Sequence, residues 1–175
     1  MTSKIKLLIF LSILPFYGCG VYSLTGASID YTTVKTVSIQ NVYNDTPNGP
    51  ANLTQVFTER LRDYFQANTN LELVPFDGDL QFEGKIVRYD TQPVAPRASN
   101  DPNQVDLSTL TQLNIAVQMK YTNVNDDQYD FDRSFSFQDN FDNTQFTLPD
   151  VEDELIVIIS DQIIIDIFNA SVANW

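Results

Sequence analysis

The chain carries a single cysteine, Cys19, at a position where acylation of its thiol is the expected chemistry. Two lysines and then the apolar run Leu7–Tyr17 precede Gly18 and this cysteine. A positive start, a short apolar stretch and a small residue are the parts of a secretory signal peptide. A cysteine directly after them, as in Phe16-Tyr17-Gly18-Cys19, indicates a lipobox. The sequence therefore predicts that residues 1–18 are removed and that Cys19 becomes a lipid-anchored N-terminus.

The apolar run is about eleven residues long, which is too short to cross a hydrocarbon core of ~30 Å. An anchored protein of this type is held by two or more acyl chains, since one chain alone binds a membrane only weakly. The alternative is an ordinary signal peptide followed by an unpaired thiol. Gly20 follows the cysteine, and no acidic cluster occurs in Gly20–Ile29. This pattern favours the periplasmic face of the outer membrane as the location.

The composition removes most catalytic chemistry. The chain has no histidine, so the commonest general base and the usual zinc ligand are both missing. If Cys19 is acylated, no thiol remains for catalysis. Asp126-Asp127 and the pair Asp77/Asp79 lack the spacing of an EF-hand calcium loop. We therefore expect no catalytic residue, metal or cofactor, with a periplasmic hydrolase based on two carboxylates as the enzymatic alternative.

The formal net charge of −13 indicates which ligands the surface can take. Such acidity argues against binding of nucleic acid, because its phosphates need many basic side chains. An anionic ligand would therefore have to bind at a few basic residues and not at a broad basic surface. The candidates for contact with an anionic ligand or a partner carboxylate are Arg97, Lys120 and Arg133. The structural alternatives are a solvated Arg97, a solubilising Lys120, and an Arg133 packed at a sheet edge with its head in water.

Alternation of apolar and polar residues predicts a series of strands. The clearest is the run Leu113–Tyr121, followed after a polar turn by the aromatic run Tyr129–Phe141, and together they predict an antiparallel hairpin. Asp90–Asp106 is expected to form a long loop. Further strands are predicted at Val34–Tyr43, Leu71–Phe76 (closed by the turn Asp77-Gly78) and Leu80–Ile86.

Two helices are predicted. Apolar residues from Leu53 to Phe65 recur at helical spacing after Pro50. Thr147–Asp150 has the pattern of a capping box, and the apolar segment Leu155–Phe168 follows it; its isoleucines leave a strand as the alternative. The order of elements predicts an α+β domain with two helices on one face of a sheet. We divide the chain into a signal peptide (1–18), a lipidated tether (19–33) and one domain (34–175).

Several segments in this order resemble the LptE family, the lipopolysaccharide-assembly lipoproteins of Gram-negative outer membranes. The resemblance covers essentially the whole chain after the signal peptide. It is carried by Cys19–Gly26, Thr36–Gln40, Phe57–Phe65, Asp79–Ile86, Tyr89 with Pro93–Pro96, Val151–Leu155 and Asp166–Asn169.

The resemblance implies a two-layer sandwich in which two helices pack on a four-stranded, mostly antiparallel sheet. It also implies a lipid-anchored plug in the lumen of the outer-membrane translocon β-barrel, which supports barrel assembly and helps deliver lipopolysaccharide to the outer leaflet. The implied partners are this barrel and lipopolysaccharide itself, which family members bind through basic residues. A pilotin-like protein or a barrel-assembly accessory lipoprotein is the alternative adaptor.

Overall fold

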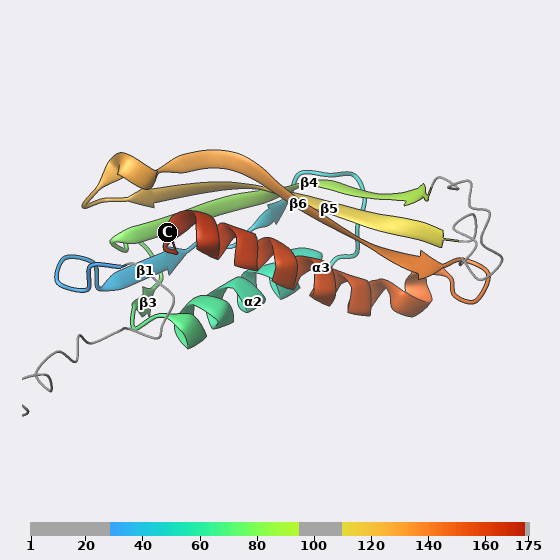
Figure 1. Ribbon diagram of the computed structural model, residues 1–175, viewed down its shortest axis with the longest axis horizontal. Coiled ribbons are helices and arrows are strands. Elements are labelled where there is room, and N and C mark those ends of the chain that lie inside the picture. The colour runs from blue at the N-terminus through green and yellow to red at the C-terminus, as the bar shows by residue number, and fades with distance from the viewer. Residues whose placement is uncertain (1–28, 95–109, 174–175) are drawn as a thin grey trace, which may run out of the picture.

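The computed structural model describes residues 29–94 and 110–173. A sheet forms one layer and two helices form the other (Figure 1). The elements in chain order are β1 (Thr36–Ile39), β2 (Tyr43–Asn44), α2 (Leu53–Asn68), β3 (Glu72–Val74), β4 (Leu80–Pro93), β5 (Leu110–Asn123), the 3-10 turn η3 (Asp127–Tyr129), β6 (Phe131–Asp142) and α3 (Leu148–Ser171).

The predicted α+β class with two helices is confirmed, but the four-stranded, mostly antiparallel sheet was wrong. The sheet has six strands in the order β3-β1-β4-β5-β6, with β2 also paired to β4. β1 is parallel to β3 and to β4, and β2 is parallel to β4. The long pairings of β4 with β5 and β5 with β6 are antiparallel. The sheet is mixed because α2 connects β1 to β3, and a crossover helix returns the chain in the same direction.

Among the strand boundaries that differ from the sequence prediction, two change how the sheet is built. The predicted strand Val34–Tyr43 is divided into β1 and the two-residue β2. The predicted loop Asp90–Asp106 begins too early, because β4 continues to Pro93 opposite Thr111 of β5. Backbone pairing with β5 overrides the turn-forming composition there, and a proline at a strand end removes no interior hydrogen bond.

The core lies between the sheet and the helices. The predicted apolar side of α2 is buried through Leu53, Phe57, Leu61 and Phe65. α3 is a helix and not a strand, and its isoleucines pack against β5, β6 and α2. The alternate residues of β5 that face these helices are the predicted apolar set: Leu113, Ile115, Val117, Met119 and Tyr121.

The start of α3 has the predicted capping box. Asp150 accepts hydrogen bonds from the backbone N–H of Thr147 at 2.8 Å and from its hydroxyl. These bonds lower the pKa of Asp150, because they favour the charged carboxylate. No described helix is long and apolar enough to span a bilayer.

The turn Asp77-Gly78 ties β4 to β1. Asp77 adopts a φ of 53°, and the Gly78 amide donates to the Ser38 hydroxyl. Asp79 then accepts from the backbone amides of Lys35 and Thr36 at 2.9 and 3.0 Å. This turn therefore sets where the parallel part of the sheet begins.

We expect Gly78→Ala to destabilise the protein by about 1–3 kcal/mol, the usual cost of overpacking. A Cβ at Gly78 would lie 2.5 Å from the backbone nitrogen of Ser38 and 2.8 Å from the backbone carbon of Val37, so the backbone of β1 would have to shift. The control is Gly84→Ala, where the Cβ would meet the mobile end of the Met119 side chain at 2.7 Å. Urea unfolding should show the larger loss at Gly78; equal losses would contradict this account.

Stability should fall as the pH drops below about 4, the ordinary pKa of an aspartate. Hydrogen bonds from Lys35 and Thr36 hold the pKa of Asp79 below its usual value in the folded state. A lowered folded pKa stabilises the protein above the unfolded pKa, and this contribution disappears as the carboxyl is protonated. Asp79→Asn should lower stability at pH 7 and weaken the dependence on pH, measured by urea unfolding from pH 7 to pH 3. Asp77→Asn, the same change of charge at an exposed side chain of this turn, is the control.

Candidate functional site

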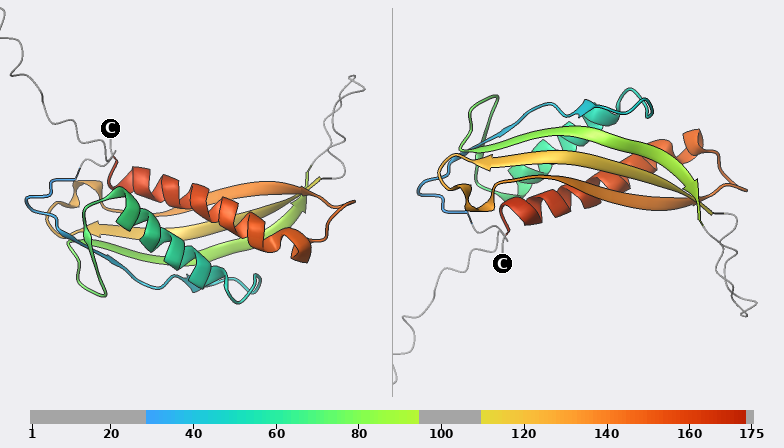
Figure 2. Two further views of the ribbon diagram at one scale, coloured as in Figure 1. Left: turned by 90° about the horizontal axis from the view of Figure 1, so that it is seen from below. Right: turned by 90° about the horizontal axis from the view of Figure 1, so that it is seen from above.

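One face of the sheet has no helix over it in the described part of the chain. Figure 2 shows α2 and α3 both on the opposite face. We call the uncovered side the open face. In β5 it carries the polar residues that alternate with the core set: Gln112, Asn114, Gln118, Lys120 and Thr122, with Ala116 among them.

Basic side chains gather on the open face. Lys85 and Arg88 of β4 and Lys120 of β5 all occupy it. The register places Lys85 beside Gln118 and Arg88 beside Ala116, both of which belong to the open-face set of β5. The part of the sheet that could meet an anion is therefore central, across two adjacent strands.

A β-bulge puts Arg88 on this face. Strict alternation from Lys85 would turn Arg88 toward the helices, but the pairing shifts between Ile86 and Arg88. The extra residue, Val87, changes which side the following residues face. Lys85 could have been assigned to the polar side from the predicted alternation of Leu80–Ile86. Arg88 could not, because the sequence gives no sign of the bulge.

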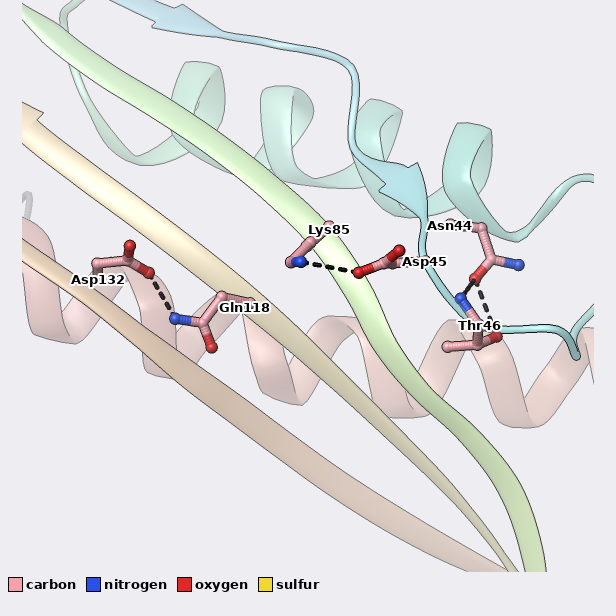
Figure 3. Close-up of polar contacts among 6 residues, drawn as sticks. All are labelled: Asn44, Asp45, Thr46, Lys85, Gln118 and Asp132. Atoms are coloured by element: carbon pink, nitrogen blue, oxygen red, sulfur yellow. Dashed lines mark hydrogen bonds and ion pairs between the residues drawn. The ribbon is translucent and has the colours of Figure 1, made fainter.

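Lys85 is held by an ion pair. Its ammonium lies 2.7 Å from Asp45, just after β2, and the bond raises the pKa of Lys85 (Figure 3). Asn44 accepts hydrogen bonds from the backbone N–H and hydroxyl of Thr46, which fixes the loop that carries Asp45. Lys85 is thus partly neutralised, since both partners remain largely accessible to solvent.

Lys120 has a different environment. It stands between Glu83 on β4 and Asp132 on β6 in the strand register, but it forms no ion pair with any described residue. Asp132 instead accepts a hydrogen bond from the Gln118 amide (Figure 3). Lys120 lines a shallow depression of about 170 Å³ together with Tyr43, Glu83, Gly84, Lys85, Gln118 and Asp132.

Arg133 lies on the other side of the sheet from Lys120. Its guanidinium carbon is 5.0 Å from the ring centre of Phe131 and 4.8 Å from that of Phe135. Both contacts are within the range of cation–π attraction. The side chain is exposed on the border strand, which matches the expected arginine at a sheet edge. One ligand headgroup cannot be shared by Lys120 and Arg133.

Of the other residues singled out in the sequence, two lie outside the described structure and two have structural roles. Cys19 and Arg97 lie outside the described residues. Asp126 accepts the Gln128 amide at the start of η3, and Asp79 ties β4 to β1. No group of three metal-ligating side chains occurs in residues 29–94 and 110–173.

Hydrogen bonds hold the pKa of four described aspartates below its ordinary value. These bonds come from neighbouring residues and stabilise the charged form of Asp30, Asp79, Asp142 and Asp150. Glu152 accepts a hydrogen bond from the Tyr89 hydroxyl, and burial raises the pKa of that phenol. This contact joins α3 to β4.

Comparison with solved structures identifies a shared fold at low sequence identity. The hypothetical protein CT253 from Chlamydia trachomatis matches with a TM-score of 0.50 at 10% identity, over 76% of this chain and 93% of that one. XCC0632 from Xanthomonas campestris also has a TM-score of 0.50 at 10% identity, and the match covers 79% of this chain and 87% of that one. A minor lipoprotein from Acinetobacter baumannii has a TM-score of 0.46 at 15% identity, over 78% and 91%.

Comparison with curated proteins finds no sequence match. The model of the LptE family, described as lipopolysaccharide-assembly, matches residues 34–171. This match extends from just before β1 to the last residue of α3, so it includes every described strand and helix. The chain therefore belongs to the LptE family and has a role in lipopolysaccharide assembly.

Proposed function

We propose that this protein is a lipid-anchored plug of the outer-membrane lipopolysaccharide translocon. It occupies the lumen of the translocon β-barrel, supports assembly of that barrel and assists delivery of lipopolysaccharide to the outer leaflet. It is held at the periplasmic face of the outer membrane by acyl chains on Cys19 and acts by contact, not by reaction.

The open face carries this proposal. The lumen of a large membrane barrel is polar and wet, so a domain that sits inside it needs a polar surface. The described sheet exposes amides, hydroxyls and charges there and turns its apolar residues to the helices. Family membership supports the choice of the lipopolysaccharide machinery over a pilotin-like or barrel-assembly adaptor.

The cations of the open face support direct contact with lipopolysaccharide. Phosphates and carboxylates on its sugars are anions that lysine and arginine bind well. Arg88 and Lys120 form no ion pair with any described residue, and they project from adjacent strands. Arg97, which the sequence also indicated as a candidate, is a further proposed contact with lipopolysaccharide.

The barrel partnership is tested by co-purification. The full chain with a C-terminal affinity tag, extracted from outer membranes in mild detergent, should retain the translocon barrel at a near-equal molar ratio. Cys19→Ala should abolish acylation and membrane fractionation and greatly reduce barrel recovery, while circular dichroism of the soluble domain stays unchanged. Recovery of a different membrane protein in place of the barrel would favour the alternative adaptors.

Contact with lipopolysaccharide is tested by charge reversal. Lys120→Glu and Arg88→Glu should each weaken binding by about fivefold, near the upper limit for one accessible charge. Arg133→Glu makes the same change of charge on the opposite face and should leave affinity nearly unchanged. Titration with fluorescently labelled lipopolysaccharide measures all three. Equal losses for the three variants would mean that net charge, and not the open face, controls binding.

A further inference from the structure

Strand β6 forms one border of the sheet, and no described strand lies beyond it (Figure 2). It pairs along its whole length with β5, from Phe131 opposite Tyr121 to Asp142 opposite Leu110. At the opposite border, β3 has three residues. β6 therefore has a long row of backbone groups on its outer edge, and such a row is a template for pairing with another chain.

The outer edge of β6 is accessible over most of its length. Residues from Asp132 to Gln138 are exposed, with the exception of Phe135. The strand contains no proline or lysine, which natural proteins often use to block an edge. Arg133 and Asp139 do lie on the face toward the helices. Inward-pointing charges of this kind disfavour pairing with an apolar strand. Of the two, Asp139 favours a partner strand that carries a basic side chain at that point.

A groove adjoins the end of this strand. Figure 1 shows the end of β6 and the start of α3 side by side. The cavity between them has a volume of about 300 Å³. Two of its apolar residues are well exposed: Phe146 at 48% and Ile158 at 42%. Its other apolar residues are Phe141, Val151 and Leu155. A side chain of an added strand could bury apolar surface here.

The charge of the groove selects its occupant. Asp139, Asp142 and Glu154 line it, and no basic residue does. A segment with basic side chains would gain from these charges.

We propose that the outer edge of β6 and this groove bind an extended segment of a partner protein in which basic and apolar side chains alternate along one face. The segment adds a strand beside Asp132–Gln138. At its end, an apolar side chain contacts Ile158 and a basic side chain meets Asp139 and Glu154. Main-chain pairing supplies affinity and the groove supplies specificity, as in other cases of strand addition. This inference does not depend on the barrel-plug role.

The test uses a synthetic peptide of roughly eight residues, a common strand length, with the repeat Lys-Thr-Val-Thr. NMR should show slower hydrogen exchange for outward amides of β6 when the peptide is added. A Glu-Thr-Val-Thr peptide should not bind. A Lys-Thr-Val-Thr peptide with N-methylated backbone should lose most of its affinity, because it cannot pair with the edge.

Substitutions in the groove test whether it contributes to peptide binding. Asp139→Asn combined with Glu154→Gln should weaken binding by about fivefold, in line with two accessible charges. Ile158→Ser tests the apolar contact by a separate change and should also weaken binding. The control is Glu59→Gln combined with Asp63→Asn on α2, which removes the same charge and should leave affinity unchanged.

Three results would overturn the inference. One is equal affinity for the N-methylated peptide, and another is equal loss in the α2 control. The third is a dimer, seen by sedimentation, that protects the β6 amides without peptide, because the occupant would then be a second copy.

Discussion

Burial of α3 between the long antiparallel strands and α2 is the interaction on which the rest of this structure depends. Ile159, Ile163 and Ile167 are completely buried. Each contributes roughly 1.5–3 kcal/mol relative to an exposed side chain. A helix this apolar needs partners on more than one side, and the sheet and α2 provide them. Since side chains alternate along a strand, the sheet that covers α3 with apolar residues has a polar face on its other side.

The basic residues divide between structural and accessible positions. Arg60 of α2 binds Asp161 of α3 through two hydrogen bonds of 2.6 and 2.5 Å, which joins the two helices. Arg62 donates to the carbonyl of Ile39 at 2.7 Å and so fastens α2 to β1. Lys120 and Arg88 form no ion pair with any described residue. Their surroundings differ, because Lys120 stands between Glu83 and Asp132 in the strand register, whereas Arg88 lies opposite Ala116.

Prediction from the sequence succeeded where one interaction dominates. Apolar residues alternate along Leu113–Tyr121, and they recur at helical spacing from Leu53 to Phe65. Each pattern results from burial of one side of the element, and the structure has the strand β5 and the helix α2 at these places. It failed where pairing outweighs composition. β2 is two residues long and exists because it lies beside β4, and the end of β4 is extended by β5 despite turn-forming residues. The mixed topology follows from the crossover through α2, which local patterns do not encode.

By itself, the sequence determined the α+β class, the two helices, the hairpin of β5 and β6, and membership of the LptE family, because periodic burial and ordered motifs are local properties. The tertiary structure decided which cations share a face. Lys120 and Arg133 were equal candidates in the sequence, and strand pairing placed them on opposite sides. Arg88 joined Lys120 through a bulge. Such proximity depends on register, and register is set by contacts between segments distant in the chain.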